Sequence, residues 1–168
     1  LLPYVAREVY QMDQTGLGYL IASFASAALI SSMALSLAAT RRRLARMMIV
    51  FAAAWYALLL LFGQMESAAG GIVVLMLIGF AQGMSVVPLA VILLRTSSEA
   101  LRGRVMGVRM LAIYGLPIGL LAAGALIDRI GFSATVSLYA GMGLLCVILI
   151  AAHWRADLWS MQAPANAS

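Results

Sequence analysis

Few side chains in this sequence are of types that do chemistry, and they form no catalytic set. His153 is the one histidine and Cys146 the one cysteine. Neither belongs to a cluster with the spacing of metal ligands, no serine is paired with a buried base, and no glycine-rich phosphate loop ends in Lys-Ser or Lys-Thr. The sequence therefore predicts neither an enzyme nor an ATP-driven motor, and it predicts no metal and no cofactor.

The remaining candidates are neutral polar residues and prolines inside apolar segments. Gln82 and Ser85 lie three residues apart, hence on one helical face, and Pro88 follows them. Tyr114 precedes Pro117 in a later segment, and both prolines are expected to kink their helices. A glutamine in lipid is costly unless it faces protein or water. These two segments, which carry Gln82, Ser85 and Tyr114, are therefore predicted to line something aqueous or polar; simple hydrogen bonding between helices is the alternative.

The elements that must position these residues are predicted to be membrane-spanning helices. The chain of 168 residues is 64% hydrophobic and only 10% charged, against roughly 25% charged in soluble domains. Five apolar stretches approach the length of about 20 residues that crosses a bilayer. They are Leu17–Ala38, Met47–Phe62, Gly71–Leu94, Val105–Ile127 and Phe132–Ala152. We predict an all-α, polytopic transmembrane helical bundle of five spans. Gly63 to Ala69 are expected to extend the second span, and Leu1–Val9 to be the tail of a preceding helix, broken at Pro3.

Small residues recur at four-residue spacing in three of these stretches, which lets helix backbones approach closely in lipid. They are Ser23, Ala27 and Ser31 in the first stretch, Gly79 and Gly83 in the third, and Gly115 and Gly119 in the fourth. The second stretch has no polar residue between Met47 and Tyr56. It is predicted to face lipid on the outside of the bundle.

The basic residues, all of them arginine, indicate the orientation of the spans. Nine of the eleven fall on one side of the predicted bundle: Arg41, Arg42, Arg43, Arg46, Arg95, Arg102, Arg104, Arg109 and Arg155. Because cytoplasmic loops carry the excess of basic residues, this side and the C-terminus are predicted to be cytoplasmic, with residues 156–168 as a short disordered tail. The net charge of +5 lies between apolar runs rather than on a basic face. The expected environment is therefore a lipid bilayer, and no nucleic acid is expected as a partner.

Two stretches carry a resemblance to a known family. The first runs from Leu101 to Gly131. It begins Leu101-Arg-Gly-Arg-Val-Met-Gly107 and ends Ala-Gly-Ala-Leu-Ile-Asp-Arg-Ile-Gly131, and it resembles loop 10–11 and helix 11 of major facilitator superfamily transporters. The branch it is most similar to contains enterobactin-exporter-like and multidrug efflux permeases. The second stretch resembles the end of helix 7 and the outer loop after it. It consists of Leu2-Pro-Tyr-Val-Ala-Arg-Glu-Val9 and Thr15-Gly-Leu-Gly-Tyr19.

This resemblance implies that residues 1–155 are helices 8 to 12 of a twelve-helix carrier, with the tail of helix 7. The chain would then be a fragment whose partner is a missing N-terminal half. The implied function is secondary active transport in the bacterial inner membrane, with efflux of a small-molecule substrate (a drug, siderophore or metabolite) by alternating access. This chain would supply one wall of the substrate cavity, with Gln82, Ser85 and Tyr114 as the candidate substrate contacts. The other hypothesis is a non-transporting assembly or scaffold subunit built from the same kind of bundle.

One sequence signature of the family occurs in this chain, but on the other side of the membrane. In the family the pattern Gly-x-x-x-Asp-Arg-x-Gly belongs to cytoplasmic loops. Here it is matched by Gly124, Asp128, Arg129 and Gly131, which are predicted to lie on the outer side. The gating role of that signature is therefore not transferred. Asp128 and Arg129 are expected to cap helix ends or to pair at the outer surface.

Overall fold

The computed structural model describes residues 2–38 and 44–153 of the chain, and throughout these ranges the chain is helical apart from short connections. Its elements are α1 (Leu2–Tyr4), the π-helix η1 (Val5–Val9), α2 (Gln14–Ala38), α3 (Leu44–Phe62), α4 (Ala68–Thr96), α5 (Glu99–Tyr114), α6 (Leu116–Ile130) and α7 (Phe132–His153). Five segments are long and apolar enough to cross a membrane, with α5 and α6 together supplying one of them. The predicted all-α bundle of five spans is confirmed.

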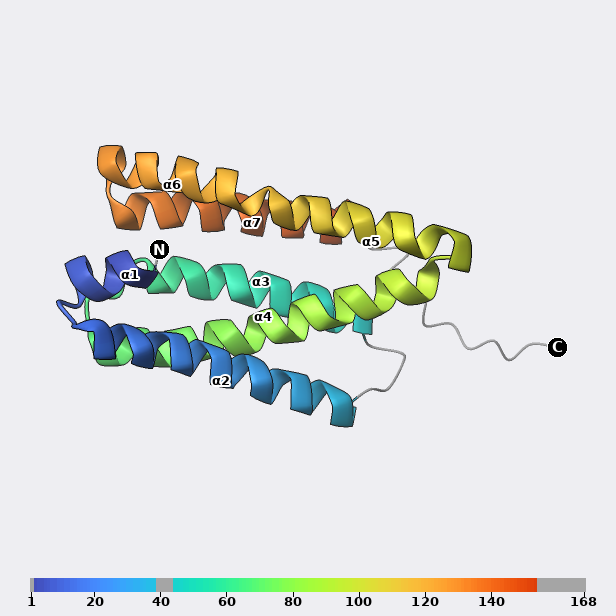
Figure 1. Cartoon of the computed structure of the whole chain (residues 1–168), viewed down its shortest axis with the longest axis horizontal. Helices are drawn as coiled ribbons and strands as arrows, with labels where there is room; N and C mark the ends of the chain where they lie inside the picture. The colour runs from blue at the N-terminus through green and yellow to red at the C-terminus, as the bar shows by residue number, and fades with distance from the viewer. Residues whose placement is uncertain (1, 39–43, 154–168) are drawn as a thin grey trace.

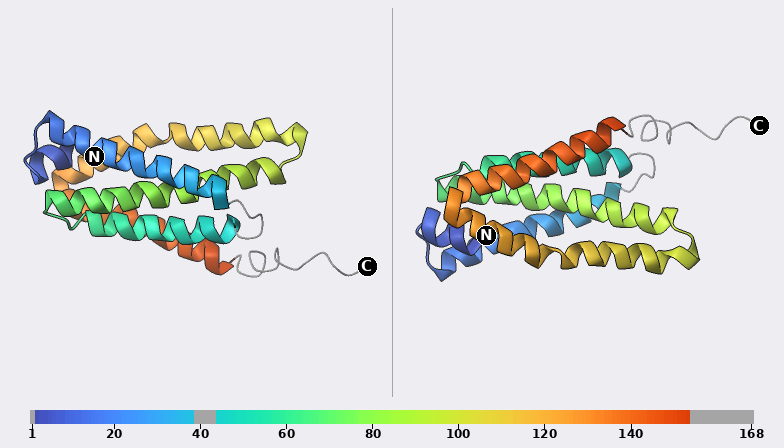
Figure 2. Two further views of the ribbon diagram at one scale, coloured as in Figure 1. Left: turned by 90° about the horizontal axis from the view of Figure 1, so that it is seen from below. Right: turned by 90° about the horizontal axis from the view of Figure 1, so that it is seen from above.

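The helices form two groups that lie side by side (Figures 1 and 2). In the first group α4 lies between α2 and α3 and packs against both; in the second, α6 packs against α7. Contact between α3 and α7 joins the groups. The connections before α2, between α3 and α4, and between α6 and α7 lie at one end of the bundle, and the α4–α5 connection lies at the other (Figure 1). Successive spans therefore alternate in direction.

Close contact between α2 and α4 rests on the small residues that the sequence spacing singled out. Ala27 and Ser31 of α2 are buried, and Gly79 and Gly83 of α4 lie against the backbone and side chains of α2. The Ser31 hydroxyl donates a hydrogen bond of 2.7 Å to the carbonyl of Ala28, so its polar group is satisfied within its own helix. The close helix packing that the small residues predicted for these two stretches is confirmed, whereas their pairing with one another was not predicted. Gly119, by contrast, has open space where a Cβ would stand.

One predicted boundary is wrong. The second span does not extend through Gly63 to Ala69, because α3 ends at Phe62 and Ser67 begins a new helix by accepting a hydrogen bond from the amide of Gly70. In the described residues the chain is helical from Leu2 to Val9, through α1 and η1, without a break at Pro3.

The second span packs on one face, and none of the residues in its apolar window is fully buried. The helix α3 packs against both α4 and α7, and most of its side chains are half-buried rather than exposed. Trp55, Leu59 and Phe62 lie at helical spacing on one face and point into the space between the two groups. Its other side carries exposed apolar side chains such as Val50 and Leu61, so the prediction of a face toward lipid stays a prediction for that side of α3.

Candidate functional site: an apolar cavity between the two helix groups

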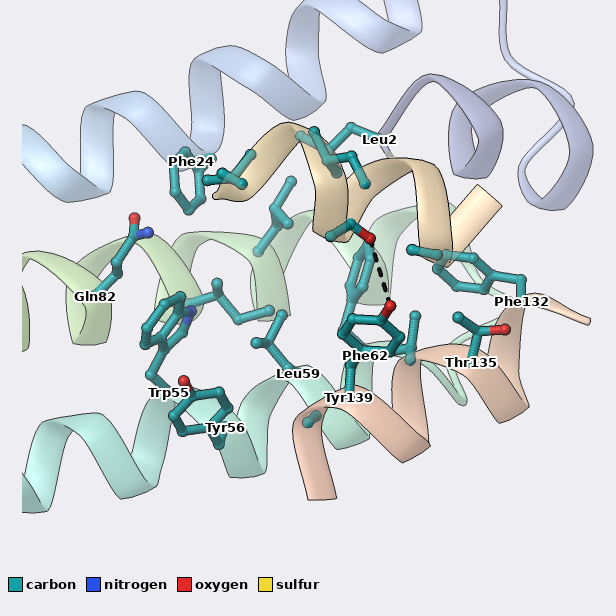
Figure 3. A pocket seen from close by; sticks show the side chains of 18 residues that line it. Leu2, Phe24, Trp55, Tyr56, Leu59, Phe62, Gln82, Phe132, Thr135 and Tyr139 are labelled. Carbon is teal, nitrogen blue, oxygen red and sulfur yellow. Dashed lines mark hydrogen bonds between the residues drawn. The ribbon is translucent and has the colours of Figure 1, made fainter. Parts of the chain in front are cut away.

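A cavity of about 540 Å³ lies between the two helix groups, and α1, α2, α3, α4, α6 and α7 all contribute to its wall (Figure 3). At the end of the bundle where α1 lies, the ring of Tyr4 stacks on that of Phe132 with centroids 5.7 Å apart. At the same end, the side-chain amide of Gln64 donates a 3.1 Å hydrogen bond to the Ser137 hydroxyl. These contacts tie both α1 and the α3–α4 connection to α7.

Six aromatic side chains contribute to the wall of the cavity, beside a larger number of aliphatic ones. The aromatic residues are Phe24, Trp55, Tyr56, Phe62, Phe132 and Tyr139. Figure 3 shows Phe24, Trp55 and Tyr56 toward one end of the cavity and Phe132 toward the other. The rings of Trp55 and Tyr56 stack with centroids 5.1 Å apart. No acidic, basic or histidine side chain is among the described residues that line the cavity.

Some polar groups in the wall have hydrogen-bond partners within the chain and others do not. The Thr135 hydroxyl donates a 2.8 Å hydrogen bond to the carbonyl of Gly131, and the Tyr139 hydroxyl donates one of 3.4 Å to the carbonyl of Gly119, which joins α7 to α6. The Gln82 side chain makes no hydrogen bond to any residue that the structure describes, and it is only half-buried. Its amide is therefore available to a ligand, as are the Tyr56 hydroxyl and the Trp55 indole N–H, which also make no hydrogen bond to a described residue.

Gln82 lies at the midpoint of α4. Fourteen residues separate it from each end of that helix, which is about 21 Å of helix on either side. A hydrocarbon core is roughly 30 Å thick, so this amide lies near the centre of the bilayer. An amide at that depth that faced lipid would be left without hydrogen bonds at considerable cost, whereas one facing a cavity can meet a ligand or water.

The structure does not bring the three predicted substrate contacts together. Gln82 lines the cavity, and Ser85, one turn further along α4, is buried outside its wall. Tyr114 lies at the end of α5 with its side chain 75% exposed, and it is not in the cavity wall.

The two prolines occupy different settings. Pro88 is buried within α4, which continues past it as one helix. Pro117 lies in the first turn of α6, directly after the interruption at Gly115 that separates α5 from α6. Tyr114 therefore lies beside a break near the middle of the span Leu101–Ile130.

The predicted loop arginines are described only in part. Arg102 and Arg104 are exposed in the first turns of α5, at the end of the bundle opposite α1. Arg41, Arg42 and Arg43 lie outside the described residues, as does the predicted tail at 156–168.

Sequence reasoning missed the aromatic wall. The available signal was Trp55, which lies in the middle of its span rather than at the membrane surface where tryptophan is enriched. An indole N–H at mid-span has no partner in lipid, so such a tryptophan is expected to face protein or a cavity.

Comparison with known families decides what kind of protein contains this cavity. The family model of the Major Facilitator Superfamily matches residues 1–160, which is nearly the whole chain. The chain belongs to the major facilitator superfamily. No curated protein and no solved structure matches it. Membership of this superfamily, together with five apolar helices, makes the chain a multi-pass membrane protein and points to a transporter rather than an enzyme.

Proposed function

We propose that this major facilitator chain forms one half of a secondary transporter that exports a small molecule across the bacterial inner membrane by alternating access. The observation that carries the proposal is the Gln82 amide, which lies at the midpoint of α4 and lines a cavity without a partner among the described residues. A neutral polar group at this depth is suited to a midplane substrate site. Export, rather than import, follows from the efflux branch that the sequence resembles.

Tyr114 is proposed to contact the substrate at a different surface from the one that Gln82 lines. Its hydroxyl is exposed beside a helix break near mid-span, where hydrocarbon offers no hydrogen bond. This face of α5 and α6 is therefore proposed to meet the N-terminal half of the transporter, with Tyr114 on the path between the halves. Ser85 is proposed to become accessible to the substrate when these helices move relative to α4.

The cavity itself supplies no group for proton transfer. The described residues in its wall include no carboxylate, histidine or lysine, and a proton relay through the membrane needs titratable side chains. We therefore place the coupling to an ion in the partner half.

The proposal is tested by transport in a strain that lacks its own efflux pumps. The chain is expressed with an N-terminal half, and growth is measured against a panel of toxic small molecules. Gln82→Ala combined with Tyr114→Phe is expected to remove resistance to at least one compound. Tyr19→Phe, at an exposed tyrosine on α2, is the matched control and keeps resistance. Unchanged resistance in the double variant, at equal membrane expression, means that the site assignment is wrong.

A further inference from the structure

The tip of the hairpin formed by α4 and α5, residues 89–109, carries four arginines and one acidic residue, Glu99. We infer that this tip binds the phosphate of an anionic phospholipid through Arg102 and Arg109 of α5. Such binding depends neither on the proposed transport nor on its direction. The depth of the tip, the helical face that the two arginines share and their charge all point to it.

The hairpin tip lies at the depth of the lipid headgroups. The 19 residues of α3 make about 28 Å of helix, close to the hydrocarbon thickness of roughly 30 Å. The 29 residues of α4 and the 30 residues of the span Leu101–Ile130 make about 44 Å each. The α3–α4 and α6–α7 connections share the opposite end of the bundle, so the extra length, about ten residues in each helix, lies at the tip. Figure 2 shows the tip projecting beyond the described ends of α2, α3 and α7.

One face of α5 combines the two arginines with apolar side chains. Arg102, Met106, Arg109 and Ile113 follow one another by four, three and four residues and therefore lie along one face. Side chains of a helix tilt toward its N-terminus, which in α5 is the tip, so the Arg109 side chain extends toward the headgroups and toward Arg102. A phosphate beside Arg102 is then within reach of both guanidinium groups. Ile113 is exposed one turn deeper, where an acyl chain of the same lipid can contact it.

The two arginines have no counter-charge within the described chain. Neither Arg102 nor Arg109 makes an ion pair or a hydrogen bond with any residue that the structure describes. Arg102 lies near the start of α5, where the positive end of the helix dipole disfavours a cation, and half-buried Arg109 lies at the edge of the hydrocarbon. A lipid phosphate supplies negative charge at this depth, and a guanidinium group can donate two parallel hydrogen bonds to it.

This face of α5 is not the one proposed to meet the N-terminal half. Tyr114 follows Arg109 by five residues, which turns it about 140° around the helix. A lipid therefore has access to Arg102 and Arg109 beside a partner that covers Tyr114. An acidic side chain of that partner is the other group that could neutralise these arginines, and the experiment separates the two.

Lipid binding is measured by native mass spectrometry of the purified chain in a neutral detergent. Phosphatidylglycerol is compared with phosphatidylcholine that has the same acyl chains, and the anionic lipid is expected to bind at least about tenfold more tightly. Arg102→Gln combined with Arg109→Gln is expected to remove most of this preference. Arg7→Gln combined with Arg129→Gln is the matched control, since it removes two exposed arginines at the opposite end, and it is expected to keep the preference. Equal loss in the two double variants, or no preference in the wild type, overturns the inference.

A third double variant separates charge from folding. Arg102→Lys combined with Arg109→Lys keeps both positive charges and is expected to retain more of the preference than the glutamine variant. Loss as complete as that in the glutamine variant would mean that charge is not the cause, and the inference fails.

Two further measurements identify the source of the anion. Inorganic phosphate is expected to displace phosphatidylglycerol poorly, because it has no acyl chain to contact Ile113 and the surrounding bilayer. Displacement at a concentration similar to that of the lipid indicates a site for soluble phosphate and overturns the inference. Co-purification with an N-terminal half is expected to leave the arginine-dependent preference in place. Its disappearance in that complex assigns Arg102 and Arg109 to a protein contact and refutes lipid binding.

Discussion

The backbone carbonyl of Phe24 on α2 lies directly against Gly79 of α4, so that a Cβ on this glycine would overlap the carbonyl oxygen. One helical turn further along, Gly83 meets the side chain of Ser31 in the same way. Contact at these distances requires glycine; at Gly79 it brings two backbones together, and at Gly83 it makes room for the Ser31 side chain. The first helix group therefore depends on these two positions.

Replacing Gly79 by Ala is predicted to destabilise the protein. The added methyl group meets backbone rather than a movable side chain, so the helices must separate, at a cost of about 1–3 kcal/mol. The free energy of unfolding is measured by titration of mixed micelles with sodium dodecyl sulfate. Gly103→Ala on α5, where a Cβ meets nothing, is the control and should be neutral or stabilising by up to about 1 kcal/mol. Equal loss in both variants would contradict the packing of α2 on α4.

Gly131 is predicted to be intolerant of a side chain for a different reason. Its backbone has φ 82° and ψ 167°, a conformation that is close to exclusive to glycine. Its carbonyl accepts hydrogen bonds from both the backbone amide and the hydroxyl of Thr135, so the turn cannot relax freely. Gly131→Ala should cost about 1–3 kcal/mol of unfolding free energy. Gly141→Ala, in open helix on α7, should not, and a comparable loss there would rule out backbone strain as the cause.

The turn at Gly131 also bears on the acidic and basic residues before it. Asp128 and Arg129 are both exposed, and no ion pair joins them in the part of the chain that the structure describes. Arg129 lies in the last turn of α6, where a positive charge is favourable next to the helix dipole. Of the two expectations for this pair, the helix-end role fits Arg129, and pairing between the two side chains does not occur.

The loss of stability at alkaline pH is predicted to depend on Tyr10. Its hydroxyl is buried against Gly71 with no hydrogen bond to any described residue, and this burial raises the pKa of Tyr10 above the ordinary tyrosine value of about 10. Because the unfolded chain ionises first, the stabilising contribution is complete below about pH 10 and is lost as pH rises through the folded-state pKa.

Unfolding midpoints measured from pH 7.5 to 11 check this dependence on Tyr10. The wild type should lose stability above about pH 10, and Tyr10→Phe should lose less. Tyr19→Phe, whose side chain is exposed, is the matched control and should follow the wild type. Identical curves for the wild type and Tyr10→Phe would assign the alkaline loss to other groups.

Orientation in the membrane is predicted from the two ends of the bundle. Glu66 is exposed at the end that carries α1, and Arg102 is exposed at the opposite end. In a background with Cys146→Ala, single cysteine substitutions Glu66→Cys and Arg102→Cys are treated with a membrane-impermeant maleimide outside intact cells whose outer membrane has been permeabilised. Labelling of the Glu66 variant alone is expected, and both should be labelled after lysis. The reverse pattern would place the arginine-rich end outside.

The span count was predictable from sequence, whereas helix ends and helix partners were not. Length and apolarity define a span without regard to its neighbours, so all five were found. The ends depend on single caps: the Asp13 carboxylate accepts a 2.9 Å hydrogen bond from the amide of Gly16 and starts α2 before the apolar run does. Ser67 does the same for α4.

The site was predictable only where a polar residue interrupts an apolar face. Gln82 was singled out because an amide in lipid needs an explanation, and the structure puts it in a cavity wall. Trp55 and Tyr139 were missed because every face of a membrane helix is apolar, so hydropathy does not distinguish a face turned to a cavity from one turned to lipid. The distance between Gln82 and Tyr114 depends on how α4 packs relative to α5 and α6, which no local pattern encodes.

The sparse packing around α5 affects how the chain behaves over time. This helix contacts mainly α4 and α6, its neighbours in the sequence, and Leu111 and Tyr114 remain largely exposed. Its stability in this chain comes mainly from its own backbone hydrogen bonds, while α4 is held from two sides by α2 and α3. In detergent, amide hydrogens of α5 should exchange with deuterium well before those of α4. Protection gained by α5 when a partner half is added would locate the contact between the two.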